Sequence, residues 1–156
     1  MWQRIQTVFI AIVILSLTAT IFFPIWVYSI PNETLELYAL HYTVKTAGEA
    51  GLVRNTTYMP YSLTAILAVA AITLALIEIT KYRNRMLQLK LGALNSLFIA
   101  GTMLCAVLFS NDFVQTYKGQ YGLGLWLPGV AVLCNLLANR FIRRDERIVR
   151  ESSRLR

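Results

Sequence analysis

The sequence predicts an all-α membrane protein: a four-helix transmembrane bundle with a small extracytoplasmic β-hairpin-like loop and a basic amphipathic C-terminal helix. Two observations lead to this fold class. Hydrophobic residues make up 56% of the 156 residues and charged residues only 15%, whereas a typical soluble domain has about 25% charged residues. In addition, the charges are gathered between long apolar stretches. This composition excludes a disordered chain and a soluble domain with an ordinary charged surface.

Four apolar stretches are the expected membrane spans, at residues 6–28, 61–80, 89–110 and 123–138. The hydrocarbon core of a bilayer is about 30 Å thick, so a helix that rises about 1.5 Å per residue needs about 20 residues to cross it. The first three stretches reach that length. The fourth is shorter and contains Pro128, which a helix tolerates in its first turn. We therefore expect a bundle over residues 1–140 and a cytoplasmic tail over residues 141–156.

The positions of the basic residues orient these spans. The formal net charge is +7, from 15 Lys and Arg against 8 Asp and Glu. Twelve of the basic residues fall on one side of the predicted membrane: Arg4, Lys81, Arg83, Arg85, Lys90, Arg140, Arg143, Arg144, Arg147, Arg150, Arg154 and Arg156. Because Lys and Arg collect on the cytoplasmic side, we expect a multi-pass membrane protein with both termini in the cytoplasm and the lipid bilayer around it.

The segment between the first two spans, residues 29–60, is the only sizeable piece expected outside the membrane. Its residues 34–45 are rich in Leu, Tyr, Thr and Val, which suit a half-buried strand. Gly48 and Gly51 favour a turn, after which residues 52–53 or 56–58 can pair back. A lone hairpin is only marginally stable in water. This small hairpin or sheet is therefore expected to rest on the helix ends or on a partner.

No pattern in the sequence predicts catalysis, a cofactor or a metal site. His41 is the only histidine, so a site that needs two histidines is excluded. Cys105 and Cys134 lie inside predicted spans without a neighbouring cysteine, which favours simple helix packing. We therefore expect a protein that is not an enzyme. A membrane enzyme or redox subunit is an alternative that requires a cofactor held by partner residues.

Glu78 is the one acidic residue inside a predicted span. An ionisable residue within the membrane is by default a functional hypothesis. However, Glu78 lies three residues before Lys81 and about one turn from the cytoplasmic boundary, where an ion pair or headgroup water can satisfy it. The first interpretation of Glu78 is therefore structural or interfacial. The alternative is a small transporter or channel in which Glu78, Asn95 and Asn135 line a polar path.

Side-chain amides and small residues mark the expected helix contacts. Amides within spans form hydrogen bonds across helix interfaces, worth about 0.6 kcal/mol each on average. Small residues let helix backbones approach closely, which is the main attraction available in lipid. These residues serve either packing within the bundle or contact with a partner protein. They are Gly92, Asn95, Ser96, Ala100, Asn135 and Asn139.

The tail combines positive charge with an apolar stripe. Its apolar residues recur every seventh position, at Phe141, Ile148 and Leu155. The i,i+4 pairs Glu146–Arg150 and Arg147–Glu151 support a helix. Nucleic-acid binding is excluded because no stacking aromatic residues or folded reading module accompany the charge. The tail is expected to lie on anionic lipid of the inner leaflet or to dock a cytosolic protein. Its candidate docking residues are Arg140, Arg143, Arg144, Arg147 and Arg150.

Several segments resemble one known family: the start MWQRIQTVF, the exit FFPIW from the first span, the linker KYRNRMLQLKLGALN and the ending YGLGLWLPGVAVLCNLLANRFIRRDERIVRESSRLR. The resemblance, which runs end to end, is to a domain-of-unknown-function family of small four-helix inner-membrane proteins of Bacteroidetes-type bacteria. It implies a plasma-membrane location with four spans, and it assigns no activity, substrate or catalytic residue. A looser likeness to claudin-type proteins concerns architecture only, because residues 29–60 lack the paired cysteines of that group.

These features together predict a non-enzymatic accessory or scaffolding subunit of a larger inner-membrane complex. The sequence holds no catalytic constellation, but it does hold packing stripes, a loop that needs support and a tail suited to docking. Other membrane proteins are therefore the expected partners, together with anionic lipid.

Overall fold

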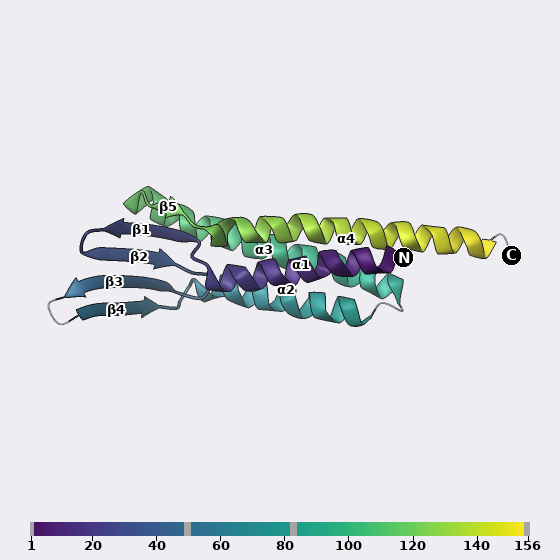
Figure 1. Ribbon diagram of the computed structural model, residues 1–156, viewed down its shortest axis with the longest axis horizontal. Helices are drawn as coiled ribbons and strands as arrows, with labels where there is room; N and C mark the ends of the chain where they lie inside the picture. Colours follow the sequence, from purple (N-terminus) through teal and green to yellow (C-terminus); the bar gives the residue numbers. More distant parts are fainter. Residues whose placement is uncertain (1, 49–50, 82–83, 155–156) are drawn as a thin grey trace.

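The computed structural model describes residues 2–48, 51–81 and 84–154. The helices of the described chain are α1 (Trp2–Phe22), α2 (Ser62–Thr80), α3 (Arg85–Tyr117) and α4 (Leu123–Arg154). They run side by side in an elongated bundle, and a β-sheet stands at one end of it (Figure 1). Both chain termini lie at the opposite end, where α4 continues well beyond the other helices (Figure 1).

All four helices are long and apolar enough to cross a membrane. This confirms the prediction of four helical segments of membrane-spanning length. Their large apolar side chains point outward, since Leu15, Leu97 and Leu133 are 68%, 68% and 64% exposed. Such a surface is unfavourable in water, but it is the ordinary outer surface of a helix bundle in lipid.

Small residues let the helices approach one another inside the bundle. On α2 the buried positions recur every three or four residues and include Ala68, Ala71 and Ala75, which is the spacing of one helix face. The middle of the bundle contains a core layer to which every helix contributes: Val13, Leu17, Ala71, Ile99 and Ala131. Close backbone packing of this kind is the main attraction between helices in lipid.

The prediction of an all-α fold is wrong, because the chain also forms a five-stranded antiparallel sheet. Its strands are β1 (Trp26–Ile30), β2 (Glu33–Leu37), β3 (Tyr42–Gly48), β4 (Gly51–Thr57) and β5 (Gln120–Tyr121). Their order across the sheet is β4-β3-β2-β1-β5. β2, β3 and β4 fall within residues 29–60, where the sequence predicts a small hairpin or sheet. β1 begins inside the predicted first span, and β5 lies between α3 and α4, so neither strand is part of that prediction.

Strand β1 explains why the hydropathy pattern predicted too long a first helix. The apolar run over residues 6–28 reads as one long span, but α1 ends at Phe22 and Pro24 follows. Proline disfavours the helical conformation of the residue before it. The apolar residues of β1 then pair with β2, with Trp26 opposite Leu37. A short buried strand and the end of an apolar helix have the same hydropathy, so only the pairing separates them.

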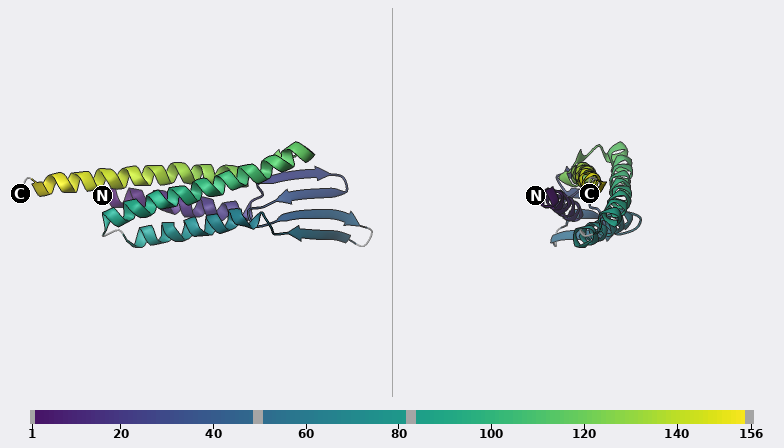
Figure 2. Two further views of the ribbon diagram at one scale, coloured as in Figure 1. Left: turned by 180° about the vertical axis from the view of Figure 1, so that it is seen from behind. Right: turned by 90° about the vertical axis from the view of Figure 1, so that its right-hand side faces the viewer.

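The sheet is supported by the outer end of α3. This helix is 33 residues long and reaches alongside the sheet (Figure 2). Its Phe113 stacks on Trp26 of β1 and on Tyr42 of β3, with ring centroids 5.2 and 4.7 Å apart. Register places Trp26, Leu37 and Tyr42 in one row across the sheet. One face of the sheet is therefore an aromatic core, in which burial raises the pKa of Tyr42 to about 12.

Candidate functional site

The candidate site is a cluster of buried polar side chains between α2, α3 and α4. Glu78 of α2, Asn95 of α3 and Asn135 of α4 are each 0% exposed, and Asn139 is 8% exposed. Glu78 lies two residues before the end of α2, and Gly92 lies in the second turn of α3. The cluster therefore occupies the half of the bundle remote from the sheet.

Asn135 joins α4 to α3. Its Nδ2 donates to the backbone carbonyl of Gly92 at 3.0 Å and to Oγ of Ser96 at 2.8 Å. The Ser96 hydroxyl donates in turn to the same Gly92 carbonyl at 3.0 Å. The structure thus brings together three of the residues predicted as helix contacts. A hydrogen bond from its side-chain amide to another helix is what the sequence predicts for Asn135.

At Gly92, side chains of α2 and α4 lie close against the backbone of α3. A side chain there would collide with Asn139, whose Cγ lies 2.9 Å from the place of a Cβ, and with Oε1 of Glu78 at 3.0 Å. The missing side chain of Gly92 therefore lets polar groups of α2 and α4 meet across α3. Close approach, not backbone flexibility, is the reason for a glycine at this position.

Several polar atoms of the cluster have no hydrogen-bond partner among the described residues. They are both carboxyl oxygens of Glu78, both amide atoms of Asn95, and one side-chain oxygen each of Gln88, Asn135 and Asn139. The ion pair with Lys81, one of the two arrangements that the sequence allows for Glu78, is not among the ion pairs of the described residues. Glu78 is fully buried, whereas Lys81 is exposed. Unpartnered buried polar groups are costly. Their concentration here sets the cluster apart from ordinary packing.

Gln88 belongs to the cluster although the sequence analysis did not select it. It is 2% exposed and lies four residues before Gly92. Positions 88, 92, 95, 99 and 102 repeat every three or four residues along one buried face of α3. This repeat is visible in the sequence and is the signal that identifies Gln88. Ala100 was predicted as a helix contact, but it does not fall on this repeat and lies exposed on another side of α3.

A second feature is a row of arginines on α4. Arg140, Arg143, Arg144 and Arg147 are exposed, and the first two line a groove between α3 and α4 together with Ala93, Ser96, Leu136 and Asn139. Asp145 turns away from this row and pairs with Arg85 of α3 at 3.1 Å. The helix is continuous from the predicted fourth span into the predicted tail.

Part of the apolar stripe of the tail is used inside the protein. Phe141 stacks on Phe9 of α1 with ring centroids 5.6 Å apart, whereas Ile148 is 49% exposed. The remaining predictions for basic and tail residues lie outside the described residues or side chains: Arg4, Arg83, Arg150, Glu151, Arg154, Leu155 and Arg156, and with them the pairs Glu146–Arg150 and Arg147–Glu151.

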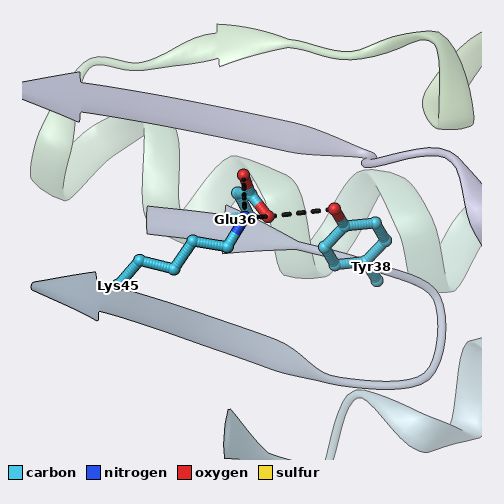
Figure 3. A network of polar contacts seen from close by, with 3 residues as sticks. All are labelled: Glu36, Tyr38 and Lys45. Atoms are coloured by element: carbon cyan, nitrogen blue, oxygen red, sulfur yellow. Dashed lines mark hydrogen bonds and ion pairs between the residues drawn. The ribbon is translucent and has the colours of Figure 1, made fainter. Parts of the chain in front are cut away.

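The outer face of the sheet, opposite to its aromatic core, carries a polar network (Figure 3). Lys45 of β3 bridges both carboxylate oxygens of Glu36 at 2.7 Å, and the Tyr38 hydroxyl donates to Glu36 at 2.9 Å. Burial raises the pKa of Glu36, but the hydrogen bonds from Lys45 and Tyr38 outweigh it and hold the pKa below its usual value. His41 stacks on Tyr38, and burial together with the charge of Arg54 lowers the pKa of His41.

One edge of the sheet is open. β4 is the last strand in the sheet order, so only β3 pairs with it. Its side chains Leu52 and Val53 are 78% and 59% exposed, and Arg54 and Asn55 are exposed as well. Gly48 pairs with Gly51 across the predicted turn. Among the described residues no group of three or more His, Cys, Asp or Glu side chains is placed to hold a metal ion.

The chain matches the family model described as a domain of unknown function (DUF4293) over residues 2–155, and it therefore belongs to that family. No curated protein matches it.

Proposed function

We propose that this family member is a non-enzymatic integral protein of the inner membrane of a Bacteroidetes-type bacterium and serves there as an accessory or scaffolding subunit of a larger membrane complex. Its proposed partners are other membrane proteins. The proposed orientation places both termini in the cytoplasm and the sheet outside. This orientation is supported by the position of the termini at the end remote from the sheet (Figure 1) and by the basic residues at that end, among them Lys81, Arg85, Lys90 and Arg140.

The open edge of β4 carries this proposal. An exposed edge strand presents unpaired N–H and C=O groups to any chain that can pair with it. Soluble proteins usually protect such edges with charges, prolines or a covering loop. β4 is seven residues long and has one charge, Arg54, and no proline, and it exposes Leu52 and Val53. Addition of a partner strand to a sheet edge is a common mode of protein recognition. We therefore place the contact with the partner subunit at β4.

A photo-crosslinking amino acid tests this contact in native membranes. It is placed at Arg54 on β4, and a matched control places it at Gln120 on β5, the short strand at the other edge; both positions are exposed. We expect a defined crosslinked product from position 54 and none from position 120. Mass spectrometry of the product then identifies the partner.

Two outcomes would contradict the proposal. One is a protein that yields no crosslink at Arg54 and runs alone at its own mass of 17.7 kDa after purification in mild detergent. The other is a crosslinked product that consists only of two copies of this chain, because the edge would then mediate self-association and not assembly with another subunit.

A small transporter or channel is a second candidate function. The buried and unpartnered carboxyl of Glu78, together with the buried amides of Asn95 and Asn135, supports it. Proton flux into vesicles that contain the purified protein is the appropriate measurement, with Glu78→Gln as the test variant and Glu36→Gln in the outer sheet as the control. Flux that only Glu78→Gln abolishes supports this function. Absence of flux in the wild-type protein, or equal flux in both variants, overturns it.

A further inference from the structure

The groove between α3 and α4 continues into the row of arginines on α4. The groove has a volume of about 490 Å³ and is lined by Ala93, Ser96, Leu136, Asn139, Arg140 and Arg143. A neighbouring hollow of about 450 Å³ is lined by Arg140, Arg143, Arg144 and Arg147. Because Arg140 and Arg143 line both, the two hollows form one track. Its inner part combines the apolar side chains of Ala93 and Leu136 with the polar ones of Ser96 and Asn139. Its outer part is cationic.

The helical spacing explains the track. Leu136, Arg140, Arg143 and Arg147 are three or four residues apart and therefore lie on one face of α4. At about 1.5 Å per residue, the three arginines extend over about 10 Å directly below the apolar face of the span. No ion pair of the described residues involves Arg140, Arg143 or Arg147, whereas the nearby Asp145 is bound to Arg85.

We propose that this track binds one anionic phospholipid of the inner leaflet. The phosphate lies between Arg140 and Arg143, and an acyl chain lies along Ala93 and Leu136. A guanidinium group offers a planar fork of donors that matches a phosphate, so two of them form a strong anion site. The acyl chain fits because the inner part of the track belongs to the apolar, membrane-spanning part of the helices.

The depth of the track favours a lipid over an acidic protein segment. Ala93 and Leu136 lie within the two apolar helices, where backbone that is not part of a helix or a closed sheet is unfavourable. An acidic peptide from the cytoplasm would reach only Arg144 and Arg147. A phospholipid combines an anionic group and an apolar chain in one molecule, in the same order as the two parts of the track.

Lipid titration into the purified full-length protein, followed by native mass spectrometry, tests the proposal. The probes are phosphatidylglycerol and, as the zwitterionic control, phosphatidylcholine. We expect one phosphatidylglycerol molecule to bind in preference to phosphatidylcholine. Each basic residue near a membrane surface contributes a factor of about five to binding, so the double variant Arg140→Gln/Arg143→Gln should bind roughly 30-fold more weakly.

Three further variants separate a built site from general charge attraction. Arg54→Gln/Lys118→Gln removes two exposed positive charges at the sheet end and should leave binding unchanged. Arg140→Lys/Arg143→Lys keeps the charge but loses the forked donors, so binding should weaken. Ala93→Phe fills the groove without a change of charge, and it too should weaken binding, which gives a second test if the double Gln variant fails to fold.

The proposal is overturned if phosphatidylglycerol and phosphatidylcholine bind equally, or if the Arg54→Gln/Lys118→Gln variant loses as much binding as the Arg140→Gln/Arg143→Gln variant. It is also overturned if Ala93→Phe and the Lys variants bind phosphatidylglycerol like the wild-type protein, because binding would then need only charge. A photo-crosslinker at Arg140 that captures an acidic protein and no lipid would assign the track to a protein partner instead.

Discussion

Asn135 on α4 donates its side-chain amide to the backbone carbonyl of Gly92 on α3 at 3.0 Å. The two residues are 43 positions apart in the sequence, and the hydrogen bond places a polar contact inside an apolar bundle. It also places Asn139, one turn further along α4, against the open side of Gly92. The consequences for stability can be measured residue by residue.

Replacement of Asn135 by Ala should destabilise the bundle. The variant loses the hydrogen bonds to Gly92 and Ser96, and interhelical hydrogen bonds in membranes contribute about 0.6 kcal/mol on average and up to about 1.7 kcal/mol. Unfolding by sodium dodecyl sulfate in mixed micelles measures the change. Thr73→Val is the control, because the Thr73 hydroxyl is exposed and bonds only within its own helix. Equal stability of Asn135→Ala and wild type would contradict the role of this amide.

Replacement of Gly92 by Ala should destabilise the protein by about 1–3 kcal/mol, the usual cost of an overpacked core. The added methyl group would meet Asn139 and Glu78. Gly101→Ala on the same helix is a matched control, since its Cβ would meet only Leu67 at an ordinary 3.5 Å. Thermal unfolding in detergent should therefore separate the two variants. Similar melting temperatures would show that α2 and α4 do not meet at Gly92.

Replacement of Glu78 by Met should leave stability unchanged or raise it by about 1 kcal/mol. The carboxyl is fully buried and has no partner among the described residues, and apolar replacement of a buried charged group is often neutral or stabilising. Ala75→Met, one turn away on the same buried face, is the control for added volume and should destabilise. A clear loss of stability in Glu78→Met would show that the carboxyl has a strong partner.

The outer sheet should lose stability in acid. The pKa of Glu36 is below its usual value of 4.5 because Lys45 and Tyr38 bind the carboxylate. The unfolded chain therefore takes up the proton first, so the contribution of Glu36 is complete above pH 4.5 and is lost as the pH falls through its lower pKa in the folded protein. Hydrogen exchange of the β2 and β3 amides between neutral and acidic pH measures this change.

Glu36→Gln is the control for that experiment. It removes the titrating group, so the sheet should be less stable and its amides less protected from exchange at neutral pH. That protection should also depend less on pH than in the wild-type protein. The helices should behave alike in both proteins. A wild-type sheet whose protection is constant down to pH 3 would exclude a stabilising role for the Glu36–Lys45 pair.

The candidate site was visible in the sequence only in part. Glu78, Gly92, Asn95, Ser96, Asn135 and Asn139 stand out because polar or small residues are conspicuous within apolar spans. Their meeting place does not follow from that observation, since it depends on how three helices are rotated about their axes. Ala100 shows the limit: it shares the small size of Gly92 but is exposed. The small size of a residue shows that it could form a helix contact, but the rotation of its helix about the helix axis decides whether it does.

Composition and the placement of charge were enough to predict four membrane-spanning helices, because hydropathy over about 20 residues reflects the thickness of a bilayer directly. The residue types of positions 34–45 also predicted a small hairpin or sheet, but nothing in the sequence predicted the strands β1 and β5. The pairing of Trp26 with Tyr121 and the packing of Phe113 on Trp26 join segments that are far apart in the chain. A strand is stabilised by its neighbours and not by its own residues. Tertiary structure alone therefore turned the end of an apparent first span into an interior strand of a sheet.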